Sequence, residues 1–137
     1  METSVSRFGE LNSYSPLQLA YLGDAYYELL VRSALLKRSR ASMHELNRLA
    51  VQAVRASSQA SAVLHLKEMF SEEEWGYVKW GRNAKSKSVA RHASLRDYRY
   101  ATGFECLMGV LFVQGNTLRA QEIVQAVFEF LEAGFEE

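Results

Sequence analysis

A single, all-helical domain is the fold class that the sequence predicts, on three observations. The chain of 137 residues contains one proline and eight glycines, so few positions would interrupt a helix. Its hydrophobic fraction of 48% is enough for one core. Apolar side chains recur at helical spacings, with no strand-type alternation. We expect one domain over residues 1–137, with residues 1–14 as a loosely ordered N-terminal segment.

Short polar residues ahead of the apolar periods mark where helices begin, because their side-chain oxygens accept hydrogen bonds from free backbone N–H groups. Serine followed three positions later by glutamate, the pattern of a capping box, occurs at 42–45 and at 71–74. The expected caps are Ser15 (before a proline at the first helical position), Ser42, Ser57 or Ser58, Ser71, and Asn116 or Thr117.

The helices opened by these caps follow from the extent of each apolar period. They are expected at about 17–36, from 43 to about 56, from about 58 to 69, from 72 to about 81, at about 95–113 and from about 117 to 134. Gly115 lies just past the end of the fifth, where glycine commonly terminates a helix. Residues 83–93 have no apolar period and are rich in Ser, Lys and Arg, which predicts an exposed loop.

Composition excludes several classes of protein. Cys106, the one cysteine, cannot form an intrachain disulfide and is expected in the core, which fits a reducing compartment. Residues 1–16 lack the apolar segment of a signal peptide, and no apolar run approaches the roughly 20 residues of a membrane span. His44, His65 and His92 do not have zinc-site spacing. A soluble, cytoplasmic protein without a membrane partner is therefore expected.

Positive charge is concentrated in one segment although the formal net charge is +0. Residues 79–99 contain seven Lys and Arg residues against one acid, Asp97. Such a segment can attract a polyanion to one place on a neutral protein, although a charge run is more often only a solvated surface. The basic residues are Lys79, Arg82, Lys85, Lys87, Arg91, Arg96 and Arg99.

Two expected helices carry carboxylates in otherwise apolar surroundings. Asp24 and Glu28 share an apolar stripe of the first helix, whose opposite side carries leucines, so this helix is expected to be enclosed on most sides. Glu105 is the only charge within residues 101–112. Burying an ionised carboxylate without a partner costs on the order of several kcal/mol. Asp24 should therefore meet a metal, a water-filled cleft or a cation such as Arg99.

A shared metal site would account for both acids. Mg²⁺ prefers oxygen ligands and keeps several waters, so one or two carboxylates suffice for each ion. A metal held in this way can promote hydrolysis of a phosphodiester by activating water and offsetting charge on the phosphate.

Two segments resemble the catalytic motifs of a known family. LAYLGDAYYELLVRSALL, residues 19–36, resembles the signature helix of ribonuclease III catalytic domains, whose Leu-Gly-Asp-Ala is matched at 22–25. FECLMG, residues 104–109, resembles the second catalytic segment of that family. GRNAKS at 81–86 and YRYATGFE at 98–105 resemble more specifically the Mini-ribonuclease III branch, which lacks a double-stranded-RNA-binding domain. The resemblance covers nearly the whole chain.

This resemblance implies a ribonuclease III endonuclease-domain fold and a metal-dependent endoribonuclease that cleaves double-stranded RNA. Asp24 and Glu105 would be the catalytic, metal-binding acids, with Mg²⁺ as the cofactor and Mn²⁺ as an alternative. The family implies a homodimer with its signature helices near the twofold axis and each site cutting one strand. The branch implies maturation of the large-subunit (23S) ribosomal RNA precursor, with a ribosomal protein as a further partner. Arg82, Lys85, Lys87, Arg91 and Arg99 are the expected RNA-binding residues.

Two positions depart from the general family pattern. Ala20 and Thr102 stand where ribonuclease III usually carries a glutamate and an aspartate, as is typical of the Mini branch. Only Asp24 and Glu105 therefore match catalytic acids of the family. This leaves the number of metal ions open and Glu28 as a candidate auxiliary acid. Tyr21, Tyr26 and Tyr27 are assigned equally to a dimer interface and to the core.

Two alternatives remain at this point. The chain could be a catalytically weak RNA- or ribosome-binding module of the same fold, or a helical scaffold whose acids form only ion pairs. Retention of both motif acids favours catalysis over the first alternative.

Overall fold

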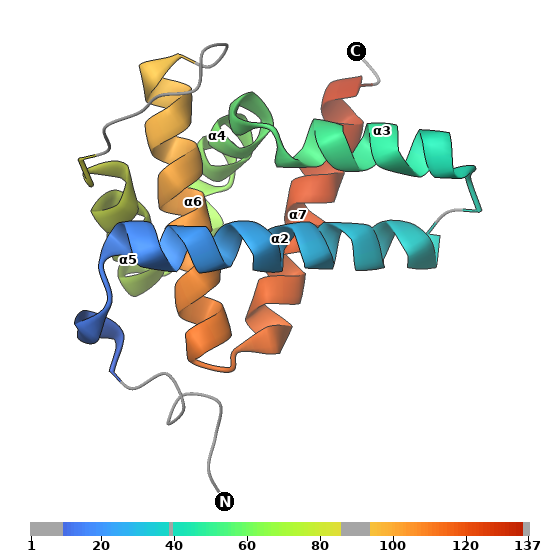
Figure 1. Ribbon diagram of the computed structural model, residues 1–137. Helices are drawn as coiled ribbons and strands as arrows, with labels where there is room; N and C mark the ends of the chain where they lie inside the picture. The colour runs from blue at the N-terminus through green and yellow to red at the C-terminus, as the bar shows by residue number, and fades with distance from the viewer. Residues whose placement is uncertain (1–9, 39, 86–93, 136–137) are drawn as a thin grey trace, which may run out of the picture.

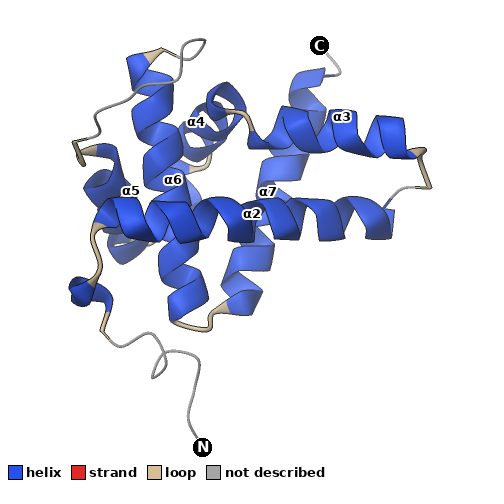
Figure 2. Cartoon of the chain, in the orientation of Figure 1, coloured by secondary structure: helices blue, strands red, loops and turns tan. Residues whose placement is uncertain are grey.

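The structure is a computed structural model that describes residues 10–38, 40–85 and 94–135 (Figure 1). Its regular elements within these ranges are all helices, and no strand occurs among them (Figure 2). The prediction of an all-α fold is therefore confirmed. In chain order the elements are η1 (Leu11–Ser13), α2 (Pro16–Arg38), α3 (Met43–Val54), α4 (Ala56–His65), η2 (Lys67–Met69), α5 (Glu72–Arg82), α6 (Leu95–Val113) and α7 (Thr117–Phe135).

α6 is the central helix of the fold. α2 crosses it, α4 and α5 pack against it, and α7 contacts α2, α4 and α6 (Figure 1). α3 runs beside α2. Because neighbours cover α6 on several sides, nearly every residue from Ala101 to Val113 is buried. This coverage explains why its sequence is apolar around most of the helix instead of along one stripe.

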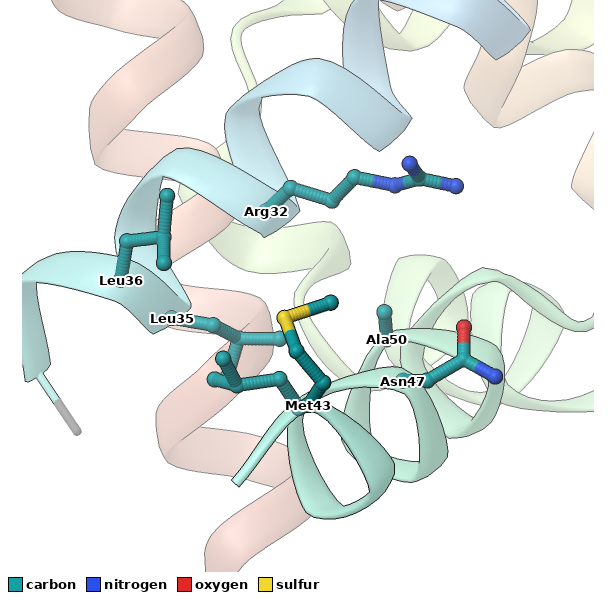
Figure 3. Close-up of a pocket in the computed structure, with 7 residues that line it drawn as sticks. Arg32, Leu35, Leu36, Met43, Asn47 and Ala50 are labelled. Carbon is teal, nitrogen blue, oxygen red and sulfur yellow. The ribbon is translucent and has the colours of Figure 1, made fainter. Parts of the chain in front are cut away.

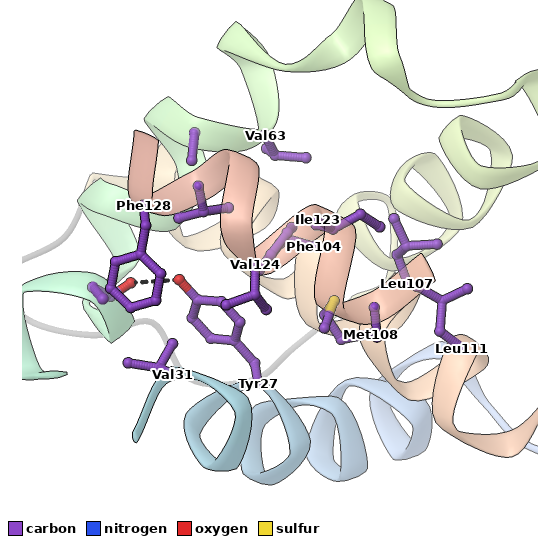
Figure 4. Packing of buried hydrophobic residues seen from close by; sticks show 14 of the residues in the cluster. Tyr27, Val31, Val63, Phe104, Leu107, Met108, Leu111, Ile123, Val124 and Phe128 are labelled. Carbon is purple, nitrogen blue, oxygen red and sulfur yellow. Dashed lines mark hydrogen bonds between the residues drawn. The ribbon is translucent and has the colours of Figure 1, made fainter. Parts of the chain in front are cut away.

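The core is centred on the aromatic pair Tyr27 and Phe104 (Figure 4). Their rings meet edge to face, with centroids 5.0 Å apart and an interplanar angle of 90°. The Tyr27 hydroxyl donates a hydrogen bond of 2.9 Å to the Ala53 carbonyl, so this tyrosine belongs to the core and ties α2 to α3. Cys106 is also buried as predicted, and burial raises the pKa of its thiol to about 12, which leaves it a packing residue.

Most predicted caps are formed. Ser71 and Glu74 form a complete capping box at the start of α5, and Ser15 and Gln18 exchange the same pair of bonds at the start of α2. The box predicted at 42–45 is only half formed. Ser42 accepts from the Glu45 backbone N–H, but the Glu45 carboxylate pairs with Arg48.

The helix predicted to begin after Ser57 or Ser58 starts earlier and without a side-chain cap. Arg55, which has an extended backbone, is the single residue between α3 and α4, so both serines lie in the first turn of α4. α4 also ends at His65 instead of continuing to Met69, and η2 occupies the end of that expected span. Both predicted boundaries were wrong, because α4 begins directly after the extended Arg55 without a serine cap and the chain leaves the α-helical conformation at Leu66.

α2 is covered on one side only, which corrects the prediction that it is enclosed on most sides. Leu19, Tyr27 and Val31 are buried. Tyr21 and Leu29 are 85% and 61% exposed, because the other helices pack against the opposite face. Asp24 is likewise exposed.

Glycines allow α2 and α6 to cross with their backbones in contact. A Cβ placed on Gly23 would lie 1.7 Å from the Glu105 carbonyl oxygen, and one on Gly109 would lie 2.0 Å from the Leu19 carbonyl oxygen. Any side chain at either position would force the helices apart. The crossing therefore brings the residues after Gly23 directly beside Glu105.

The expected loosely ordered N-terminal segment covers residues 1–14. Residues 1–9 lie outside the described residues. Residues 11–13 form η1, and Leu11 and Tyr14 pack against the buried cluster that includes Leu19 and Val110, so residues 11–14 are not a loosely ordered segment. None of the helices in the described ranges combines the length and apolar character that crossing a membrane requires.

Candidate active site

The two motif acids come together where α2 crosses α6. Asp24 follows Gly23 on α2, and Glu105 is the residue whose backbone Gly23 contacts. The carboxyl groups of Asp24 and Glu105 are close enough to form a side-chain hydrogen bond. Residues far apart in the sequence are thus placed as one carboxylate pair, with the Asp24 side exposed and the Glu105 side half-buried.

Without a bound cation, it is unfavourable for both carboxyl groups of this pair to be ionised at once. Burial raises the pKa of Glu105 to about 8, and the neighbouring Asp24 charge and the hydrogen bond between the two carboxyl groups act in the same direction. A hydrogen bond from Gln59 opposes this rise. Because two ionised carboxylates in contact repel each other, the arrangement favours either a shared proton or a bound cation.

Basic side chains do not neutralise the pair in the part of the chain that the structure describes. Neither Asp24 nor Glu105 forms a salt bridge there, and Arg99, the arginine considered as a partner, lies in a different cluster. The ion-pair alternative therefore has no support from the geometry. Glu28 instead faces Arg32, 3.5 Å away on the next turn of α2.

The donor set fits a hydrated divalent cation. No third Asp, Glu, His or Cys joins the two acids in a metal-binding cluster among the described residues. Two carboxylates, one of them exposed, suit an ion such as Mg²⁺, which keeps several of its waters. They do not suit zinc, which prefers a closed set of nitrogen and sulfur ligands.

Gln59 is a residue of this site that the sequence reasoning missed. It lies on α4, is 1% exposed, and its Nε2 lies 3.4 Å from Glu105 Oε2 and 2.6 Å from the Val54 carbonyl oxygen. Its Oε1 is buried without a hydrogen-bond partner in the described structure. One uncharged amide among small residues is an ordinary feature of a helix sequence, so only the fold reveals this contact.

Part of the predicted RNA-binding set forms a basic hollow. Arg82 and Arg99 line a hollow of about 270 Å³ between the end of α5 and the start of α6, together with Arg96 and Tyr100. The guanidinium groups of Arg82 and Arg96 lie 5.5 and 5.7 Å from the centre of the Tyr100 ring. Lys85, three residues after Arg82, is exposed. Lys87 and Arg91 lie outside the described residues.

A second hollow, of about 190 Å³, lies between α2 and α3 and is mainly apolar (Figure 3). Leu36 and Met43 at its rim are 69% and 76% exposed. Neither Asp24 nor Glu105 lines it, so it is not part of the carboxylate site.

Comparison with known proteins agrees with the motifs. Residues 17–116 match the Ribonuclease III domain family. The chain is 42% identical to the Mini-ribonuclease 3 of Symbiobacterium thermophilum over 87% of its own length and 92% of the relative's. It is 44% identical to that of Brevibacillus brevis over 88% and 90%. A crystal structure of a Fusobacterium nucleatum protein, 27% identical, superposes with a TM-score of 0.75 and covers 85% of this chain and 93% of that one.

Proposed function

The chain belongs to the ribonuclease III family and to its Mini-ribonuclease 3 branch of endoribonucleases, and on that premise we propose that it cuts double-stranded RNA within the precursor of large-subunit (23S) ribosomal RNA. The observation that carries the proposal is the contact between Asp24 and Glu105, two acids from separate helices without an ion pair in the described ranges. This substrate would place the enzyme in the cytoplasm.

Asp24 and Glu105 would hold Mg²⁺, or Mn²⁺ in its place. When bound, the cation supplies Lewis-acid chemistry that activates water and offsets the charge developing on the phosphate and the leaving oxygen. The close crossing at Gly23 supports this role, because it holds the two carboxylates on rigid helices instead of loops. The exposed position of Asp24 leaves the pair accessible to a substrate phosphate.

We assign RNA binding to the basic segment that flanks the start of α6. Arg82 and Arg99, which line one hollow, and the exposed Lys85 would contact the phosphate backbone. Lys87 and Arg91, outside the described residues, are proposed for the same role. Contacts of this kind recognise the shape of a duplex and its 2′-hydroxyls more than its base sequence.

A homodimer through the outward face of α2 completes the proposal. Tyr21, Leu29 and Leu36 share this face and are 85%, 61% and 69% exposed, which is unusual for three large apolar side chains on one helix. Asp24 is an exposed neighbour of the same face, so two copies would bring two sites near a twofold axis. Each site would then cut one strand and leave staggered ends.

A cleavage assay on a duplex transcript of the ribosomal RNA precursor tests this function. We expect products in Mg²⁺ or Mn²⁺ and none in EDTA, with mapped ends at staggered positions on the two strands. Adding ribosomal proteins of the large subunit tests whether one of them stimulates the reaction. Asp24→Asn should fold and bind the duplex without cutting it. Glu129→Gln, which neutralises an exposed acid on α7, should cut like the wild type.

The RNA-binding alternative predicts a different outcome of the same assay. A catalytically weak module would bind the duplex and give no products in either metal. Cleavage by Asp24→Asn at the wild-type rate would instead show that the acids are not the metal site.

A further inference from the structure

Gln59 has an orientation that its hydrogen-bond partners determine. The Val54 carbonyl oxygen can only accept a hydrogen bond, so the Gln59 amide nitrogen, 2.6 Å away, must face it, and the same nitrogen lies 3.4 Å from the Glu105 carboxylate. The opposite amide orientation would place Oε1 against the Val54 carbonyl oxygen, which is itself an acceptor. The contacts thus fix which end of the Gln59 amide faces Glu105.

This orientation leaves Oε1 buried without a hydrogen-bond partner in the described structure. An unpaired buried amide oxygen is unfavourable, and Met or Leu at the same 1% exposed position would avoid it, although either would leave the Val54 carbonyl without its bond from Gln59. Core packing alone therefore does not explain a glutamine here. Its distinctive contribution is the N–H directed at Glu105, one of the two acids assigned to the metal.

We propose that Gln59 is a positioning residue of the cleavage site, whose amide orients the Glu105 carboxylate beside Asp24 for binding a divalent cation. The inference rests on the proposed function, since it assumes that the two acids hold the metal. Gln59 is suited to this role because the same Nε2 is anchored on the Val54 carbonyl at the end of α3, 2.6 Å away. The Glu105 side chain is thereby linked to the corner between α3 and α4. Partners that orient metal ligands in this way commonly change metal affinity when they are removed.

Mn²⁺ binding to the full-length protein, followed by electron paramagnetic resonance of the free ion, tests the proposal alongside thermal unfolding in EDTA. Gln59→Met keeps the length of the side chain and removes the amide. We expect its Mn²⁺ affinity to fall by about 10- to 100-fold, while its unfolding temperature in EDTA should fall no more than that of Tyr27→Phe, because each variant loses one buried hydrogen bond to a backbone carbonyl of the same corner. Gln59→Asn retains an amide that is too short to reach Glu105 and should also weaken Mn²⁺ binding, which provides a second variant if Gln59→Met fails to fold.

Tyr27→Phe is the matched control. It removes another buried side-chain hydrogen bond to the same corner, the one from the Tyr27 hydroxyl to the Ala53 carbonyl, without removing the amide contact to Glu105. We expect a lower unfolding temperature and wild-type Mn²⁺ affinity.

The outcomes distinguish failure of the positioning role of Gln59 from failure of the proposed metal-dependent function. If the wild type binds Mn²⁺ and both Gln59 variants bind it equally well, the positioning role is wrong and the metal site stands. If the wild type does not bind Mn²⁺, or Asp24→Asn binds it as tightly as the wild type, the proposed function and the role of Gln59 both fail.

Discussion

Gly23 of α2 lies directly against the backbone of Glu105 on α6, so closely that a Cβ on Gly23 would stand 1.7 Å from the Glu105 carbonyl oxygen. Gly23, the residue before the motif aspartate Asp24, therefore has a structural role in packing the two helices. It lets two helices touch through their backbones, and this contact brings the carboxyl groups of Asp24 and Glu105 together.

Replacing Gly23 with alanine should disrupt the crossing. The new methyl group would meet backbone atoms that cannot rotate away, so we expect a loss of at least about 2 kcal/mol in the free energy of unfolding, together with loss of RNA cleavage. Urea denaturation and the cleavage assay measure the two effects. Gly76→Ala on α5 is the matched control, because no atom lies within 4 Å of its Cβ position. This control should be neutral or stabilising by about 0.5–1 kcal/mol, and wild-type stability of Gly23→Ala would contradict the crossing.

Glu105→Gln should change how stability depends on pH in the absence of metal. Burial and Asp24 raise the pKa of Glu105 from its ordinary 4.5 to about 8, so the folded protein retains a proton that the unfolded chain releases in this range. Stability of the wild type should therefore contain a component that falls as pH rises from about 4.5 to about 8, and this component should be absent from the variant. Urea unfolding in EDTA across these values measures it. If the stability of the wild type and of Glu105→Gln depended on pH in the same way, the raised pKa of Glu105 would be excluded.

Metal addition should stabilise the wild type and leave Glu105→Gln nearly unaffected. A cation that binds only the folded state at about one hundred times its dissociation constant adds about 2.7 kcal/mol to the free energy of unfolding. The measurement is the unfolding midpoint with Mg²⁺ against EDTA near neutral pH. Equal stabilisation of the variant would place the ion elsewhere on the protein.

Alanine at Arg99 or Lys85 should weaken duplex binding through loss of phosphate contacts. Measured in the Asp24→Asn background, which should bind RNA without cutting it, each change should lower the slope of log affinity against log salt by about 1. Filter binding at several salt concentrations determines this slope. Arg48→Ala serves as the control, because Arg48 is an exposed arginine on α3 that pairs with Glu45. If Arg48→Ala lowered the salt-dependence slope equally, the duplex would be binding to positive charge anywhere on the protein instead of to a defined site.

Leu29→Glu should convert the proposed dimer to a monomer. Leu29 is 61% exposed on the outward face of α2, where a buried charge would be unfavourable in a twofold interface. Sedimentation velocity gives the oligomeric state, and cleavage of both strands should decline with it. Leu118→Glu, at a leucine 77% exposed on α7, should leave the dimer intact. A dimer that persists in Leu29→Glu would assign the interface to another face.

Local sequence determined the features that depend on neighbours a few residues apart. Ser71 and Glu74 lie three positions apart and form their capping box as predicted, and α6 begins and ends at the predicted Leu95 and Val113. Asp24 and Glu105 were also recognisable, since each is an acid in an apolar helix within a motif. Helix capping and charge anomalies need no tertiary information, because the interacting groups belong to one turn or one segment.

Tertiary structure decided which of these helices touch, and where. Periodicity placed Asp24 on a helix that looked enclosed, but packing on one side of α2 leaves Asp24 exposed. The amide of Gln59 has no local signal, and its contact with Glu105 depends on α4 packing against α6. These relationships join residues from separate helices, so they depend on close-packed side-chain shape and on the glycines that let backbones meet, which no short window of sequence contains.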